Sequence, residues 1–433
     1  MRASEGPDAG RAVGARATAA QRRWRRTFTP LLRPTARAAY NRAPPVKHFT
    51  PSTDPAEGLG VLMLFRLIEE SVPDFFRPDR RILITRAPGR LDVLGGLARD
   101  VDAPAVQIPV AEAACAAIQE RDDDLVRLWS PCRDGSRTQL LSMRLGDLGL
   151  PDAPIDDDEA RALLTPDPRD RWAAYLLGSL LVLARRHGLR PERGFELLMH
   201  SDVPQRCGVA SSTAIAVAAL RALALSYGVY LSPEALVDAV AALEGGILRM
   251  PHRRRDTMAV AHAEAGELLA VDAGGVRARL VVPSDLEIVA LDSGVPSATT
   301  DADADETVDV ARLQQLLAAD PTPAHRRELG DLLFAAHECY RQAGRVEPAT
   351  DFVVAAAKAR REAGGAVLGA KATGRGGGGA VLLLGEHGKV WYEALRIKKA
   401  LLEKTGHSAH VFRWSSPGAL SFGAIELQPG GEG

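Results

Sequence analysis

The stretch from Ser201 to Leu220, SDVPQRCGVASSTAIAVAAL, constrains the fold of this chain more than any other part of the sequence. It begins with polar residues and narrows to small ones around Gly208. A run of small and apolar residues then follows from Ala214 onward. This pattern predicts a loop that leads into the N-terminus of a buried helix. Gly208 would let a ligand approach the backbone closely, because glycine has no Cβ atom.

The predicted loop and helix start have the features of a phosphate site. The first N–H groups of a helix lack intrahelical partners, and this end carries partial positive charge, so it attracts phosphate. Ser211 and Ser212 stand there and would add hydrogen bonds or a Mg²⁺ ligand. The residues expected to bind a nucleotide are Pro204, Gly208, Val209, Ala210, Ser211, Ser212 and Thr213. Taken alone, the stretch also fits an ordinary helix capped by serine.

Composition limits the function classes that the chain can serve. Of its 433 residues, 46% are hydrophobic and 25% are charged, as in soluble globular proteins, and the length suggests two lobes. The net charge of −1 gives no field that favours nucleic acid or membrane, so we expect a small-molecule partner and neither of those two. The four cysteines are far apart and form no CxxC pair, which favours a reducing cytoplasm.

The two ends of the chain differ from the rest. Residues 1–47 are rich in Arg and Ala, and only Glu5 and Asp8 are acidic among them. We expect a disordered basic tail here, although a transit peptide or an over-long gene model would have the same composition. Residues 426–433 are expected to form a flexible C-terminus.

A second glycine-bearing stretch follows a predicted strand at 81–85. It reads RAPGRLDVLGG, so a Pro88-Gly89 turn is predicted directly before Arg90. A turn of this kind presents a cation from a rigid backbone, and Arg90 could hold a phosphate through two hydrogen bonds. A tight turn with a solvent-exposed arginine is the alternative.

An isolated acid stands after the basic run His252-Arg253-Arg254-Arg255. Asp256 precedes an apolar helical segment, so we expect it at a helix start inside a cleft rather than in a solvated turn. The preceding helix, predicted over 233–247 with Ser232 as its N-cap, carries Glu244 among apolar residues.

The third glycine-rich stretch spans Gly364 to Gly385, and it reads strand, glycine loop, strand. Lys371 precedes the loop, and apolar segments on both sides argue against a flexible linker. Helices are predicted on the N-terminal side of this stretch, with His325 and His337 on their surfaces.

The motifs APGRLDVLGG, VPQRCGVASSTA and KATGRGGGG, in this order, resemble the GHMP kinases. The resemblance covers about residues 80–420 and is greatest to the galactokinase branch, especially to its L-arabinokinase type. VALDSG at 289–294 and SSPGA at 415–419 support it. The resemblance implies an α+β fold of two lobes: a ribosomal-S5-like N-terminal lobe over 48–270 and a ferredoxin-like C-terminal lobe over 271–425.

The resemblance also implies roles for particular residues. ATP would lie between the lobes, with Mg²⁺ held by Ser211, Ser212 and Glu244. Asp256 matches the aspartate that orients the sugar hydroxyl or takes its proton, and Arg90 matches the arginine that pairs with this aspartate. The residues expected to contact the substrate are Asp100, Asp102, Arg255, Gly374, Gly376 and Gly377.

Two departures from the family pattern leave the substrate open. Arg99-Asp100 stands where the family has Asp-Tyr, and the run 252–255 replaces Cys-Gly-Val-Met. The arginines could recognise an acidic or otherwise altered sugar, such as a uronate or a sugar phosphate. The leading hypothesis is an ATP- and Mg²⁺-dependent kinase for a monosaccharide hydroxyl at the anomeric carbon. The alternative is a catalytically impaired, ligand-binding regulator, and the sequence allows a monomer or a homodimer.

Overall fold

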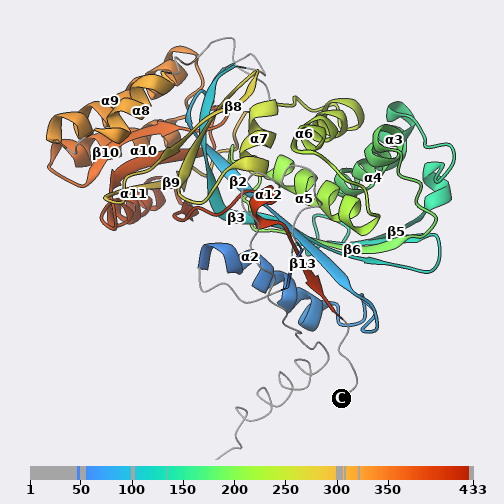
Figure 1. Ribbon diagram of the computed structural model, residues 1–433. Helices are drawn as coiled ribbons and strands as arrows, with labels where there is room; N and C mark the ends of the chain where they lie inside the picture. The colour runs from blue at the N-terminus through green and yellow to red at the C-terminus, as the bar shows by residue number, and fades with distance from the viewer. Residues whose placement is uncertain are drawn as a thin grey trace, which may run out of the picture.

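The computed structural model describes residues 46–48, 55–98, 103–132, 134–298, 306, 309–319 and 322–428; of 46–48 and 55–59 it describes the backbone alone. The expected basic tail, 1–47, therefore lies outside the described residues apart from two positions of the first strand. Among the described residues, no helix combines the length and the apolar character needed to cross a membrane. Two sheets with their helices form the two groups of elements seen in Figure 1.

The first sheet has nine strands and runs β1-β13-β2-β3-β6-β4-β5, with β7 paired to β3 and β8 paired to β7. Its strands are β1 (Val46–His48), β2 (Ile82–Leu94), β3 (Ala105–Glu120), β4 (Leu125–Trp129), β5 (Leu140–Arg144), β6 (Phe195–Ser201), β7 (Glu267–Asp272), β8 (Gly275–Val281) and β13 (Ala424–Leu427). Most neighbours are antiparallel, whereas β1 with β13 and β4 with β6 are parallel.

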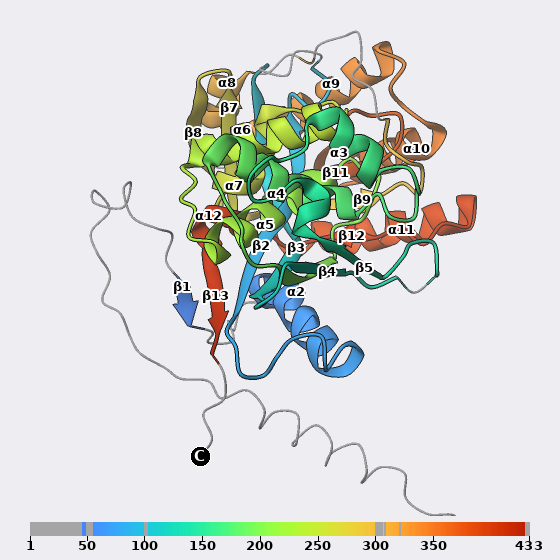
Figure 2. The ribbon, with the colours of Figure 1, turned by 90° about the vertical axis from the view of Figure 1, so that its right-hand side faces the viewer.

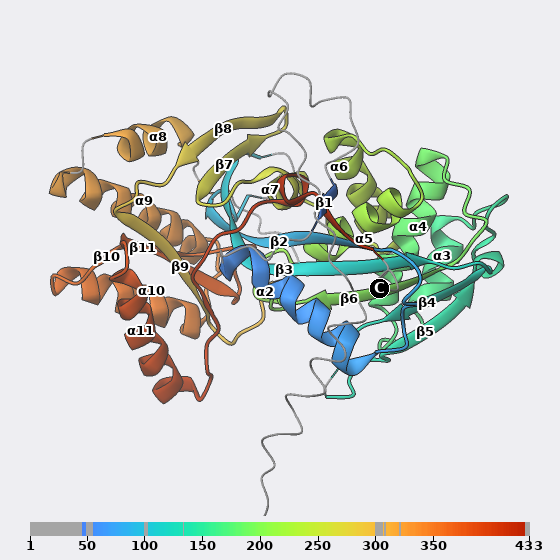
Figure 3. The same cartoon turned by 60° about the horizontal axis from the view of Figure 1, so that its bottom comes forward.

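Helices cover both faces of this sheet, which is why its central strands β2 and β3 are almost entirely buried. On one face of β2, Ile82 and Ile84 pack with α2 (Pro55–Arg66). On the other face, Leu83 and Ala87 pack with α4 (Ala173–His187) and α5 (Ser211–Ser226). Figure 3 shows α2 lying across β2, β3 and β6. The helical segments are α2 (Pro55–Arg66) with a π turn (Leu67–Ser71), a 3₁₀ turn (Leu145–Leu148), α3 (Asp157–Leu164), α4 (Ala173–His187), α5 (Ser211–Ser226), α6 (Pro233–Ala241) with a π turn (Ala242–Ile247), α7 (Arg254–His262) and α12 (Ala419–Phe422).

The second sheet has four antiparallel strands in the order β10-β11-β9-β12. Alternate residues of β11 again serve two cores: Val381 and Leu383 pack with α10 and α11, and Leu382 and Leu384 pack toward α8 and α9. The elements are β9 (Leu286–Asp292), β10 (Val367–Ala372), β11 (Ala380–Glu386), β12 (Val411–Phe412), α8 (Val310–Ala318), α9 (Pro323–Gln342), α10 (Pro348–Glu362) and α11 (Val390–Thr405).

The division of the sheets does not coincide with the expected lobe boundary at residue 270. Strand β7 crosses that position, and β8 belongs to the first sheet with it. The chain also returns to the first sheet at its end, where β13 lies between β1 and β2 (Figure 2). Glu426 and Leu427, expected in a flexible C-terminus, are therefore strand residues, and 429–433 lie outside the described residues.

Two local expectations are wrong for identifiable physical reasons. Pro88 and Gly89 form no turn but lie inside β2, at a shift in its register with β3. Gly89 is needed for close approach, since a Cβ there would lie 2.8 Å from the carbonyl oxygen of Val209. His337 is not on a helix surface: it is buried, and its Nδ1 accepts a hydrogen bond from the backbone N–H of Ala372.

Candidate active site

The three glycine-bearing motifs meet at a cleft of about 1090 Å³. Its walls come from β2, the loop before α5, the π turn after α6, the start of α7 and the loop between β10 and β11. The sequence-predicted residues that line it are Arg90, Gly208, Val209, Ala210, Ser211, Ser212, Thr213, Glu244, Asp256 and Gly374. The three glycine-bearing motifs are far apart in the sequence, and the fold brings residues of all three to one cavity.

The Ser-rich loop turns sharply into α5 at the cleft wall. Ala210 is the N-cap, with a left-handed backbone (φ 60°), and the helix begins at Ser211. No side chain caps this helix start. The first N–H groups of the helix therefore remain available to a ligand. The serine-capped helix that the sequence left open is not what forms here, because Ala210 occupies the cap position.

The second sheet fixes the Ser-rich loop from the opposite side. The N–H of Ala380 donates to the carbonyl of Cys207 at 2.9 Å. Gly374 lies so close to Gly208 that a Cβ on it would be 2.8 Å from the Gly208 carbonyl oxygen. Both glycines have φ near 70°. The two glycine loops are therefore in contact, and both require glycine to be so.

Asp256 and Arg90 form a buried ion pair at the cleft. Arg90 Nε donates to Asp256 Oδ1 at 3.1 Å and Nη2 donates to Oδ2 at 2.8 Å, so the contact is bidentate. Arg90 Nη1 also donates to the Gly208 carbonyl at 2.6 Å. Burial by itself would raise the pKa of Asp256, but the guanidinium groups of Arg90, Arg253 and Arg255 together outweigh burial, and the pKa lies far below its usual range. Asp256 is therefore ionised.

Two residues that the sequence did not single out hold this ion pair in place. Gln107 Nε2 donates to Asp256 Oδ1 at 2.9 Å and to Asp92 Oδ1 at 2.6 Å. Asp92, which is fully buried, lies 3.4 Å from Arg90 and accepts a hydrogen bond from the N–H of Gly374 at 2.9 Å. Asp92 thus joins the catalytic candidates to the loop between β10 and β11. The available signal was Gln107, a polar residue inside the apolar run 105–110.

Glu244, the predicted Mg²⁺ ligand, lies beside the start of α5. Its carboxylate accepts from the Thr213 hydroxyl at 3.1 Å, and its other oxygen lies 2.8 Å from His252 Nδ1. Among the described residues, no group of three or more His, Cys, Asp or Glu side chains could hold a metal alone. Mg²⁺ in kinases uses one or two carboxylates together with substrate phosphates, so one carboxylate and nearby hydroxyls fit.

The arginines before Asp256 are directed mainly at protein groups. Arg253 Nη1 donates to the Gly96 carbonyl at 2.7 Å, and Arg255 Nη2 donates to the Ala98 carbonyl at 3.0 Å. Both are almost fully buried, and Arg255 is not among the residues that line the cleft. Arg254 pairs with Asp238 at 2.9 Å. Arg253 and Arg255 thus hold the segment after β2.

The remaining sequence-predicted residues lie elsewhere. Pro204, Gly376 and Gly377 are not among the cleft-lining residues; Gly376 packs on Tyr340 and the Arg345 carbonyl. Asp100 and Asp102 fall outside the described residues. Lys371 is fully buried in a 2.7 Å ion pair with Glu306. The cleft also has a wall of aromatic and basic side chains that was not predicted from the sequence: Arg137, Arg171, Trp172, Tyr175, Arg206, Arg249 and Arg375.

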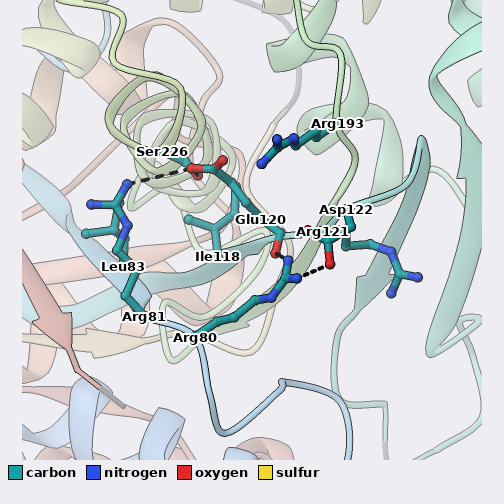
Figure 4. Close-up of a pocket in the computed structure, with 9 residues that line it drawn as sticks. All are labelled: Arg80, Arg81, Leu83, Ile118, Glu120, Arg121, Asp122, Arg193 and Ser226. Carbon is teal, nitrogen blue, oxygen red and sulfur yellow. Dashed lines mark hydrogen bonds and ion pairs between the residues drawn. The ribbon is translucent and has the colours of Figure 1, made fainter.

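A second cavity, of about 290 Å³, shares no lining residue with the cleft. Figure 4 labels Arg80, Arg81, Arg121 and Arg193 around it. Three of these are paired with acids: Arg80 with Asp122, Arg81 with Glu120, and Arg121 with Asp123 and Glu196. It contains none of the residues predicted to act in catalysis or binding. The cleft is therefore the candidate active site.

Known sequences match the part of the chain that carries several of the predicted site residues. Residues 174–263, which include α5, Glu244 and Asp256, match the family of GHMP kinases N terminal domain. The L-arabinokinase of Arabidopsis thaliana is 31% identical over 252 residues, which are 53% of this chain and 24% of that protein. A galactokinase of Chloroflexus aurantiacus is 28% identical over 223 residues, 51% of each protein. The matches thus span a quarter to a half of these relatives.

Solved structures with the same architecture cover more of the chain. Lactococcus lactis galactokinase in complex with galactose has a TM-score of 0.63 and 17% identity, over 83% of this chain and 98% of that one. Methanococcus jannaschii mevalonate kinase has a TM-score of 0.53 and 17% identity, over 77% and 98%. At these identities the likeness shows the fold, which is the two-lobed α+β arrangement predicted from the sequence.

Proposed function

We propose, on the premise that this chain carries a GHMP kinase N-terminal domain within a galactokinase-like fold, that it is an ATP-dependent sugar kinase. The reaction would transfer the terminal phosphoryl group of ATP to a monosaccharide hydroxyl, at the anomeric carbon. Support for the enzyme class comes from the relatives, which are named L-arabinokinase and galactokinase.

The observation that carries this proposal is the buried Asp256–Arg90 pair between the two glycine loops. In phosphoryl transfer the protein mainly positions groups and neutralises charge. Asp256 would accept a hydrogen bond from the sugar hydroxyl and hold its oxygen in line with the phosphorus. Because its pKa lies far below the usual range, Asp256 is a weak base and would take the proton only as the new O–P bond forms. Arg90 would stabilise charge on the transferring group.

The nucleotide would lie along the Ser-rich loop and the start of α5. Gly208, Val209, Ala210 and Thr213 line this wall together with the two serines. Ser211, Ser212 and Glu244 would hold Mg²⁺, which neutralises phosphate charge when bound. One oxygen of Glu244 lies 2.8 Å from His252 Nδ1. When Mg²⁺ binds, this contact would have to lengthen, or Glu244 would have to contact the ion and His252 at the same time.

For the sugar, we propose a neutral monosaccharide rather than an acidic one. An acidic sugar was expected only because three arginines precede Asp256. Arg253 and Arg255 donate to backbone carbonyls, and Arg254 is paired at the surface. Hydrogen bonds to the protein thus account for the run without a substrate carboxylate or phosphate.

A screen of ATP consumption over neutral sugars, uronates and sugar phosphates tests the proposal. Turnover on a neutral aldose, with a sugar 1-phosphate as product, is expected. Turnover on none of the compounds, with ATP still bound in calorimetry, would instead support the ligand-binding regulator. Preference for a uronate that is lost in Arg253→Ala would restore the acidic-sugar hypothesis.

A further inference from the structure

Arg206 has a backbone conformation that L-residues other than glycine rarely adopt. Its φ is 62°, and only two other non-glycine residues of the described part have positive φ, Ala210 (60°) and Arg249 (49°). All three line the cleft. Such a conformation costs on the order of 1–2 kcal/mol, and residues that keep it gather at functional sites.

Neighbouring segments impose this conformation on the backbone of Arg206. Its carbonyl accepts a hydrogen bond from the N–H of Ser297 at 2.7 Å, and the next carbonyl, of Cys207, accepts from Ala380 at 2.9 Å. Both donors belong to the segments around β9 and β11. The fold therefore fixes the backbone, and glycine would satisfy it at lower cost. The side chain must be retained for another reason.

The guanidinium of Arg206 differs in its contacts from most arginines of the cleft. Five of them have protein partners: Arg90 with Asp256, Arg137 with the Pro131 carbonyl, Arg249 with Asp158, Arg253 with the Gly96 carbonyl and Arg375 with the Pro251 carbonyl. Within the described part of the chain, the exposed side chains of Arg206 and Arg171 make no hydrogen bond or ion pair. Arg171 precedes α4, whereas Arg206 stands in the Ser-rich loop itself.

We propose that Arg206 binds the phosphate chain of the nucleotide, as a cation carried by the Ser-rich loop. This inference rests on the proposed function, because it takes ATP as the ligand. A guanidinium can meet phosphate oxygens through two parallel hydrogen bonds. Its gain in binding offsets the cost in backbone strain, so stability and nucleotide affinity oppose each other at this position.

Arg206→Gly separates the two effects. The glycine relieves the strain, so the melting temperature is expected to stay or rise. The Kd for ATP, measured by calorimetry with Mg²⁺ present, is expected to rise about tenfold, which corresponds to roughly 1.4 kcal/mol. The Kd for AMP, which lacks the β and γ phosphates, is expected to change much less. A merely structural role for Arg206 would lower the melting temperature and leave the ratio of the two Kd values unchanged.

Arg190→Gly is the matched control, since it removes an exposed loop arginine that does not line the cleft. Arg190 Nη1 donates to the Pro151 carbonyl at 3.3 Å, and its loss is expected to leave the Kd for ATP unchanged. Unchanged ATP affinity in Arg206→Gly, or an equal loss in both variants, overturns the inference while the kinase proposal stands. A wild-type protein that binds no ATP overturns both.

Discussion

At the residue scale, the site depends on a buried carboxylate that one arginine and one glutamine hold in place. Asp256 touches Arg90 and Gln107, and Arg90 in turn lies near Asp92. Breaking a buried ion pair leaves an uncompensated charge, which is strongly destabilising. Substitutions at Asp256 must therefore preserve shape if their effect on chemistry is to be measured.

Asp256→Asn keeps the volume and removes the charge. We expect kcat/KM on the preferred sugar to fall by about 10²–10⁴, because the amide neither accepts the hydroxyl proton nor orients it as well. The Kd for ATP should change little. Asp238→Asn is the matched control: it makes the same exchange on an exposed residue paired with Arg254 and should leave kcat/KM unchanged. Full activity of Asp256→Asn would rule out the proposed role.

At the element scale, the sequence was sufficient where the signal is local. The Ser-rich loop, α5, α7 and the glycine loop between β10 and β11 were predicted because small residues and apolar runs specify them over short distances. Hydrogen bonds between residues far apart in the sequence could not be predicted. The bond from Arg255 to the Ala98 carbonyl is an example, because it depends on tertiary packing. Gly89 was misread for the same reason.

The contact between the two glycine loops gives a prediction for Gly374→Ala. The new Cβ would overlap the Gly208 carbonyl and would sit on a backbone with φ of 69°. We expect the loops to separate and the Kd for ATP to rise at least about tenfold, or roughly 1.4 kcal/mol. Gly388→Ala has the same backbone strain, with φ of 72° and no heavy atom within 4 Å of the added Cβ. Gly388→Ala should therefore lower the stability of the protein without changing the Kd for ATP. Equal ATP affinity in the two variants would contradict the proposed role of the contact between the loops.

His337 links α9 to β10 and gives that region a pH dependence. Burial lowers the pKa of His337 in the folded state, and its Nδ1 accepts a hydrogen bond from Ala372, so the folded ring is neutral. The unfolded state binds the proton more readily, with a pKa of about 6.5. Stability from this residue is therefore complete above about pH 6.5 and is lost as the pH falls below it.

His337→Gln removes the titration. Urea unfolding between about pH 7.5 and pH 5.5 should show a smaller loss of unfolding free energy in this variant than in the wild type. Parallel losses in the two proteins would show that the ring is not held neutral.

At the scale of the whole molecule, the end of the chain completes the first sheet. β13 pairs with β2, and Ile425 is buried with Ile82 and Ile84 under α2. A chain cut after Gly423 should lose at least about 2 kcal/mol of unfolding free energy from the apolar burial alone. A chain cut after Gln428 removes none of the described strand pairs and should unfold like the full chain. Equal melting curves for the two truncations would mean that β13 adds no stability.

The position of β13 also bears on how the protein folds as it is synthesised. Thr85 of β2 pairs with Ala424. One edge of β2 therefore lacks its hydrogen-bonding strand until nearly the whole described chain has left the ribosome. All cleft-lining residues are made before that partner arrives. An unpaired strand edge invites pairing with other chains, and contacts between distant residues form slowly. Nascent chains of this protein should therefore need protection of that edge by chaperones until translation reaches β13.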